Sequence, residues 1–148
     1  MTAQNEEPAR DECNALSAHG IPGILDRDTL DHLLDVEFAR ARRYEHPFAL
    51  FRLGVVAPAS ARLVAGALRL HTRWADSVGV LESGVLLVIL RDTTRESAQA
   101  AVAKIASSLE LELGSGTVSH LQMDFAAWRK GDDRERLMSR LGPMRARG

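Results

Sequence analysis

The uncharged segment at residues 84–90, Gly-Val-Leu-Leu-Val-Ile-Leu, constrains the fold of this chain more than any other feature. It is short, and it lacks the alternation of polar and apolar residues seen in a strand with one face in water. Such a strand lies inside a sheet that is covered on both faces, usually by helices. The turn residues Glu82-Ser83-Gly84 lead into it, so it should pair with the preceding residues as a β-hairpin.

Apolar stripes at helical spacing predict the helices that would cover this sheet. Asp28 is expected to cap the first helix, and Pro58 or Ser60 to open the second. A third helix is predicted at about residues 94–111, with Asp92 as its cap, and a short last helix at 132–141. The stripe residues are Leu30, Leu33, Leu34, Phe38 and Ala41; then Leu63, Val64, Ala67 and Leu68; then Ala98, Ala101, Val102, Ile105 and Leu109.

Two further segments are predicted to be strands. Residues 48–56 would place Phe48, Leu50, Arg52 and Gly54 on one face and Ala49, Phe51, Leu53 and Val55 on the other. Residues 114–123 are interpreted as a glycine turn followed by a strand. The resulting order, α-β-α-β-β-α-β-α, predicts an α/β fold in which helices pack on a mixed sheet.

Composition narrows the class of protein. The 148 residues suit one domain, and the net charge of −1 gives no global attraction to nucleic acid or to anionic membranes. No apolar run is long enough to cross a bilayer, and the acidic start of the chain does not resemble a secretory signal. Cys13 is the only cysteine, which fits a reducing compartment. We therefore expect a cytoplasmic protein with a flexible tail at 1–20 and a loose end at 142–148.

Familiar catalytic motifs are missing from the sequence. The histidines do not stand at metal-ligand spacing from one another or from Cys13, and there is no phosphate-binding loop of the GxxxxGK[ST] type. Gly114 and Gly116 precede a predicted strand rather than a helix, which favours a plain turn. We therefore expect no metal site and no bound cofactor. The histidines are His19, His32, His46, His71 and His120.

Arg73 and Asp76, which stand just before the hairpin, are the strongest candidates for a binding site. An arginine can donate to O6 and N7 of guanine, and a nearby carboxylate can accept from its N1–H and N2–H groups. The alternative is a local ion pair, which contributes little on a surface. The residue pattern alone leaves both readings open. Trp74, between them, could stack on a base or contact a protein partner.

Three stretches together resemble GGDEF domains, the diguanylate cyclase fold. Residues 73–94 resemble the R-x-x-D-x-x-x-R-x-G-G-D-E-F segment without a gap, and residues 116–120 resemble the T-V-S-x-G strand. The resemblance implies that residues 21–141 form one such domain, a largely antiparallel mixed sheet flanked by helices, as in nucleotide cyclases. The residues that match the family's opening segment are Gly23, Arg27, Leu34, Glu37, Arg40, Ala41 and Arg43.

The same resemblance implies loss of cyclase activity. The family's G-G-D/E-E-F turn carries a metal-binding acid at its third position, where this chain has Gly84. Gly54 and Val56 stand where the first strand would supply two aspartates. Phosphoryl transfer needs metal ions held by oxygen ligands, so the resemblance predicts a catalytically inactive, degenerate domain. The chain between Gly54 and Arg73 is also shorter than in the family, which removes a guanine-contacting segment.

What the resemblance leaves intact is the family's inhibitory R-x-x-D site, which binds the bacterial second messenger cyclic di-GMP. It implies a cyclic di-GMP receptor that binds through Arg73 and Asp76, with Lys104 near a phosphate. A ligand-independent interaction or dimerisation scaffold is the alternative, with a protein partner or a homodimer. The role of Arg52, a charge inside an apolar strand, is unexplained; it could face the vacated cleft and replace the lost metal charge.

Overall fold

The computed structural model describes residues 21–55 and 61–142. The predicted tails at 1–20 and beyond residue 142, and the predicted helix start at Pro58 or Ser60, lie outside this range. The elements are β1 (Ile24–Leu25), α2 (Arg27–Tyr44), β2 (Phe48–Val55), α3 (Ala61–Leu70), β3 (Ser77–Glu82), β4 (Val85–Arg91), α4 (Arg95–Leu113), α5 (Ser115–Val118), β5 (Leu121–Ala127) and α6 (Arg134–Arg140).

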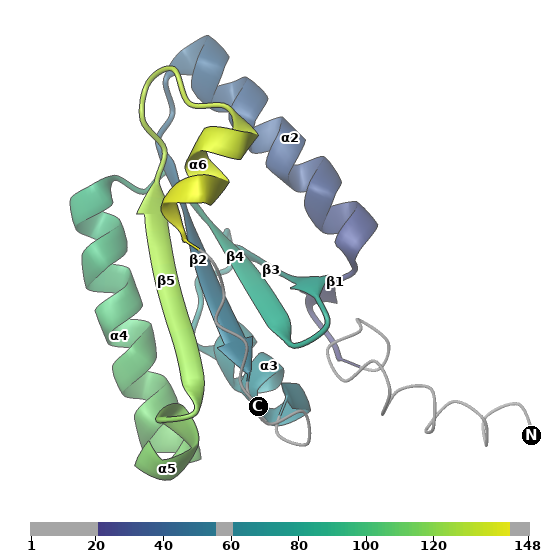
Figure 1. Cartoon of the computed structure of the whole chain (residues 1–148), viewed down its shortest axis with the longest axis vertical. Coiled ribbons are helices and arrows are strands. Elements are labelled where there is room, and N and C mark those ends of the chain that lie inside the picture. The colour runs from purple at the N-terminus through teal and green to yellow at the C-terminus, as the bar shows by residue number, and fades with distance from the viewer. Residues whose placement is uncertain (1–20, 56–60, 143–148) are drawn as a thin grey trace, which may run out of the picture.

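The five strands form one sheet in the order β1-β3-β4-β2-β5 (Figure 1). Only the β1–β3 pair is parallel within the described chain, so the sheet is mixed and largely antiparallel, as predicted. Strand β4, which contains the uncharged residues 85–90, lies in the middle, between β3 and β2. All its residues except Arg91 are buried, which confirms that a strand without polar alternation is covered on both faces.

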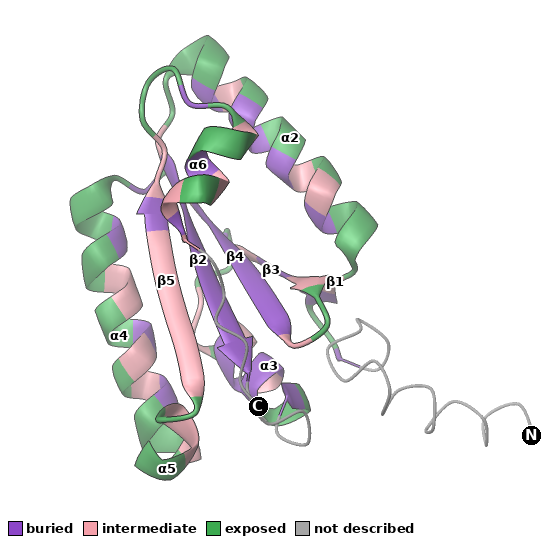
Figure 2. Ribbon diagram, viewed as in Figure 1, coloured by how far each residue is buried: buried purple, intermediate pink, exposed green. Residues whose placement is uncertain are grey.

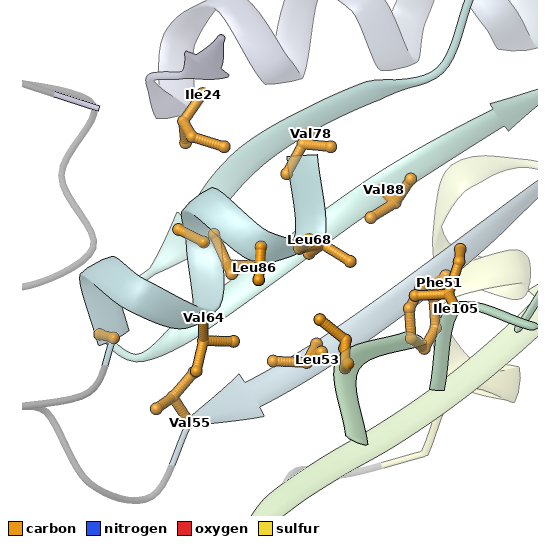
Figure 3. Close-up of a cluster of buried hydrophobic side chains, with 14 of the residues drawn as sticks. Ile24, Phe51, Leu53, Val55, Val64, Leu68, Val78, Leu86, Val88 and Ile105 are labelled. Carbon is orange, nitrogen blue, oxygen red and sulfur yellow. The ribbon is translucent and has the colours of Figure 1, made fainter. Parts of the chain in front are cut away.

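Helices cover both faces of the sheet. Two of them, α3 and α4, pack on one face, while α2 and α6 pack on the other (Figures 1 and 2). The side chains of β2 alternate between these layers as predicted: Ala49, Phe51 and Leu53 enter the α3/α4 core, and Phe48 and Leu50 enter the α2/α6 core. Figure 3 shows the α3/α4 core, in which Phe51 and Leu53 face Leu68 and Ile105.

Both predicted helix caps are wrong by two residues. Asp26, not Asp28, caps α2, because its backbone is extended and its carboxylate accepts from the Thr29 amide at 2.8 Å. Thr94, not Asp92, caps α4 by accepting from the Ser97 amide at 3.2 Å. Asp92 instead has a left-handed backbone with φ of 51°, a conformation that aspartate tolerates better than most residues.

The strand predicted at 114–123 begins only at Leu121. Residues Ser115–Val118 form the helical turn α5, which Ser119 closes by donating to the Ser115 carbonyl at 3.0 Å. The physical reason lies in the partner strand: β2 ends at Val55, and Val55 pairs with Leu121. Among the described residues no strand pairs with the chain before Leu121, and the Thr-Val-Ser matched to the family's strand lies in and just after α5 rather than in the sheet.

The apolar stripe predicted for the second helix is confirmed in α3 except at one position. Val64, Ala67 and Leu68 are buried in the α3/α4 core, whereas the Leu63 side chain is exposed. Leu63 shares the outer surface of α3 with Leu70. The prediction that Leu63 faces the core is therefore wrong, because the apolar residues of this helix extend around more of its circumference than the sheet covers.

The connection between β5 and α6 is held by Asp132 and Arg140. Both oxygens of the buried Asp132 carboxylate accept from Arg140, at 2.9 and 2.6 Å, and one also accepts from the Arg129 amide at 2.8 Å. These hydrogen bonds, above all those from Arg140, lower the pKa of Asp132 below its ordinary value of 3.8. The ionised carboxylate therefore stabilises the fold above that pH.

We expect Asp132→Asn to be less stable than the wild type by about 2 kcal/mol at neutral pH. Because the folded pKa is the lower one, this advantage of the wild type is lost as the pH falls through 3.8 and below. Urea unfolding at a series of pH values measures it, with Glu110→Gln on the exposed face of α4 as control. A difference between wild type and variant that stays constant below that pH would contradict the assignment.

Candidate functional site

The described residues form a pocket of about 580 Å³ between α4 and the segment that joins α3 to β3. Its floor is apolar, and its polar groups come from the loop 71–76 and from α4. The structure thus places all three residues predicted to bind a ligand, Arg73, Asp76 and Lys104, around one cavity. The lining residues are Leu70, His71, Thr72, Arg73, Asp76, Leu90, Ala100, Ala101, Lys104, Ile105 and Ser108.

Arg73 and Asp76 form a bidentate ion pair. Arg73 Nε donates to Oδ2 of Asp76 at 3.1 Å, and Arg73 Nη2 donates to Oδ1 at 2.8 Å. The backbone amide of Arg73 also donates to Oδ2, at 3.0 Å, and the Asp76 amide returns a bond to the Arg73 carbonyl. The four-residue turn is therefore closed by its own side chains.

The two partners of this pair differ in exposure. The side chain of Asp76 is 2% exposed, whereas that of Arg73 is 57% exposed and lies over it. The hydrogen bonds that Arg73 donates to Asp76 raise the pKa of Arg73, so the guanidinium stays charged. In this arrangement the Asp76 carboxylate is not offered to the pocket. A guanine could reach it only if the Arg73 side chain turned away.

Arg73 also ties the loop to the end of β4. Its Nη2 donates to the Arg91 carbonyl at 2.7 Å and to Oγ1 of Thr93 at 3.0 Å. Thr93 is buried and donates to the same Arg91 carbonyl. Thr93 was not predicted as a site residue, although it lies within the segment 73–94 that resembles the family and directly follows a central strand.

Lys104 lies on the exposed side of α4 and forms part of the pocket wall. His71, on the opposite wall, bonds through Nε2 to Oε1 of Glu112 at 2.7 Å, which links the loop to the last turns of α4. His71 was not predicted as a site residue, and no spacing rule would have selected it. Trp74, in contrast, is 93% exposed and is not part of the pocket lining.

Gly54 and Gly84, where the resemblance predicts the loss of metal-binding acids, lie at the tip of the β3–β4 hairpin, and Val56 lies outside the described residues. Gly54 pairs with Val85, and the Val55 amide donates to the Gly84 carbonyl at 2.8 Å, so the two glycines are neighbours without a side-chain oxygen. Gly84 has φ of 80°, which the tight turn requires. No group of three or more His, Cys, Asp or Glu that could hold a metal ion occurs within residues 21–55 and 61–142.

Arg52 does not offer a free cation to a cleft, contrary to the prediction. Its Nη2 bonds to Oδ2 of Asp124 at 2.9 Å and to the carbonyls of Leu141 and Gly142 at 3.0 and 2.6 Å. The guanidinium therefore neutralises the carbonyl end of α6 and joins it to β2 and β5, a favourable place for a cation. The charge inside this apolar strand has a structural role.

None of the described helices is long and apolar enough to span a membrane.

Comparison with known proteins gives matches in structure only. No protein-family model matches the chain, and no curated protein sequence matches it. The GGDEF domain of FimX from Pseudomonas aeruginosa superposes with a TM-score of 0.70 at 16% identity, over 82% of this chain and 86% of that one. The GGDEF domain of DgcB from Caulobacter crescentus, in complex with c-di-GMP, gives 0.65 at 12% identity, over 82% and 83%.

A third solved structure extends this likeness. PelD from Pseudomonas aeruginosa in complex with c-di-GMP gives a TM-score of 0.64 at 19% identity, over 79% of this chain and 44% of that one. At identities this low the likeness concerns the fold, which agrees with the fold predicted from the motifs. The chain has the α/β fold of GGDEF domains, with a five-stranded sheet flanked by helices.

Proposed function

We propose that this domain is a cyclic di-GMP receptor that binds the nucleotide in the pocket formed by Arg73, Asp76 and Lys104. The observation that carries the proposal is that these three residues line one cavity. Proteins of the same fold have c-di-GMP bound in their solved structures, which supports the choice of ligand. The cavity volume of about 580 Å³ lies in the range of small-molecule sites.

Each polar group has a counterpart in the ligand. The Lys104 ammonium suits a phosphate as a point charge, and the Arg73 guanidinium suits the O6 and N7 edge of guanine. Asp76 would accept from the N1–H and N2–H groups of the same base once Arg73 has rotated out of their ion pair. Because Arg73 is more than half exposed, water can solvate its guanidinium during that rotation. The ligand then replaces the hydrogen bonds that the pair gives up.

Isothermal titration with cyclic di-GMP tests the proposal. We expect the wild type to bind, Lys104→Ala to weaken binding about tenfold, and Arg73→Ala to abolish measurable binding. Arg95→Ala, which removes an exposed arginine at the start of α4 outside the pocket lining, should bind as the wild type does. Circular dichroism on each variant checks that the domain is folded at the titration temperature. No heat from the folded wild type at high micromolar ligand would refute the proposal.

We also propose that the domain does not synthesise cyclic di-GMP. Neither Gly54 nor Gly84 can supply a carboxylate with which to hold the metal ions that phosphoryl transfer requires. Incubation with GTP and Mg²⁺ or Mn²⁺, followed by chromatography, should show no product. Clear formation of the cyclic dinucleotide would contradict this part of the proposal.

One observation favours a second candidate function, a homodimerisation scaffold. The exposed apolar side chains Leu63, Leu70 and Trp74 follow one another along α3 and the loop after it, at 69%, 74% and 93% exposure. If these side chains hold two copies together, light scattering should show a dimer that Leu63→Ser with Leu70→Ser converts to a monomer. A wild-type monomer at high micromolar concentration would rule this candidate out.

A further inference from the structure

Arg69, in the last turn of α3, holds the backbone of both residues of the ion pair. Its Nη1 donates to the carbonyl of Asp76 at 2.8 Å, and its Nη2 donates to the carbonyl of Arg73 at 3.2 Å. Arg69 is not part of the pocket lining. It therefore acts on the site through the loop backbone, and a bound ligand in the pocket would not need to touch it.

The backbone carbonyl of Arg69 also binds this loop, at its first residues. Its carbonyl accepts from Oγ1 of Thr72 at 3.0 Å and from the Thr72 amide at 3.4 Å. Arg69 thus contacts the loop where it leaves α3, at Arg73 in its middle, and at Asp76 just before β3. The side chain of Trp74 is almost fully exposed, so the middle of the loop is held by Arg69 together with the side-chain bonds of Arg73.

The stem of the Arg69 side chain rests on Gly23, just before β1. A Cβ atom added to Gly23 would lie 3.1 Å from Cγ and 3.2 Å from Cδ of Arg69, closer than most real Cβ contacts. Gly23 has φ of 81°, and the Ile24 amide donates to the Ile21 carbonyl across it. The turn that leads into the domain therefore touches the same side chain that holds the ion-pair loop.

We infer that Arg69 is a positioning residue that couples the entry turn at residues 21–24 to the Arg73–Asp76 loop. A displacement of this turn moves the Arg69 stem, and the two carbonyls lose their donor. The loop then gains mobility, and the bidentate pair is no longer presented in one geometry. The consequence for cyclic di-GMP affinity rests on the proposed function, whereas the mechanical coupling does not.

Trp74 makes the coupling measurable without any ligand. The chain has two tryptophans, so Trp128→Phe leaves Trp74 as the only one, placed in the loop itself. In this background we expect Arg69→Met to lower the fluorescence anisotropy of Trp74, and Arg69→Lys, which keeps one donor group, to restore part of it. Arg42→Met, at an exposed position in the last turn of α2, should leave the anisotropy unchanged.

Gly23→Ala perturbs the same connection from its other end. It should lower the Trp74 anisotropy as well, and adding it to Arg69→Met should give little further change, because both act through one side chain. Gly131→Ala is the matched control: it imposes the same backbone strain at φ of 91° but adds a Cβ with no neighbour within 4 Å. This control should leave Trp74 unaffected.

The outcomes separate this inference from the proposed function. Lowered anisotropy in Arg69→Met and Gly23→Ala, with a non-additive double variant, supports the coupling; unchanged anisotropy or fully additive effects would overturn it. In titrations, Arg69→Met should weaken cyclic di-GMP binding about tenfold, the effect of losing two backbone hydrogen bonds. A wild type that binds no cyclic di-GMP would refute the proposed function, and the anisotropy would still decide the coupling.

Discussion

Replacing Arg73 with alanine should destabilise the domain by about 3 kcal/mol, more than replacing its partner Asp76, which should cost about 1–2 kcal/mol. The asymmetry follows from exposure. Without the Arg73 side chain, the Asp76 carboxylate loses both guanidinium bonds and keeps the bond from the backbone amide of residue 73, so water must replace the lost donors at a site that is 2% exposed in the wild type. Without Asp76, the Arg73 guanidinium is already more than half exposed and can be solvated by water.

The double variant Arg73→Ala with Asp76→Ala provides the sharper test. It removes the buried charge together with its partner, so it should be no less stable than Arg73→Ala alone and close to Asp76→Ala. Urea unfolding monitored by circular dichroism measures all three, and an unchanged dependence on urea concentration confirms that the fold is retained. Equal losses in the two single variants, or additive losses in the double variant, would contradict this account of the pair.

This result bears directly on the binding experiment. Part of any affinity lost in Arg73→Ala reflects a loop that is no longer closed, in addition to the missing contact with the ligand. Lys104→Ala does not have this effect, because Lys104 lies on the exposed side of α4 and takes no part in closing the loop. The affinity lost in Lys104→Ala therefore reports on the contact in the pocket alone. The affinity lost in Arg73→Ala reports on that contact together with the closure of the loop.

The second large effect is expected within α3. Leu68→Ala should cost about 3 kcal/mol, because the side chain is fully buried in the α3/α4 core and its removal leaves a cavity. Leu63→Ala, the same substitution five residues earlier on the same helix, should change stability by less than about 0.5 kcal/mol. Because both variants have the same effect on helix propensity, the difference between them isolates burial.

Thermal unfolding of the two variants beside the wild type is sufficient to measure this difference. A loss at Leu63 comparable to that at Leu68 would mean that α3 buries both faces, one against the sheet and one against another copy of the chain. Light scattering on the same samples distinguishes that case, since a dimer would also be seen directly.

The central part of the sheet could be predicted from local pattern alone. Residues 85–90 of β4 contain no polar side chain and require cover on both faces, and the apolar side chains of β2 alternate between two cores, so burial determines both strands. Arg73, Asp76 and Lys104 line one pocket, and their part in binding a ligand stays a prediction. These three residues were selected from the spacing of sequence motifs in a family of known fold, and not from local hydrophobic pattern.

The wrong predictions concern contacts between distant parts of the chain, which local hydrophobic pattern does not encode. Leu63 is apolar and stands at helical spacing from core residues of α3, as a core residue would. It is exposed because the sheet covers only part of the circumference of this helix. Thr117 and Val118 favour strands, but β2 has already ended opposite Leu121. The inward turn of the Asp76 carboxylate depends on three donors of Arg73, and an Arg-x-x-Asp spacing does not reveal whether the pair is open or closed.

The strand order has a consequence for synthesis of the chain on the ribosome. β2 is completed at residue 55, but its two neighbours in the sheet, β4 and β5, follow only at residues 85–91 and 121–127. At about 5–20 residues per second, the apolar β2 waits a few seconds for its first partner and longer for its second. During nascent-chain growth this strand is therefore the segment most exposed to aggregation and the first that a chaperone would need to shield.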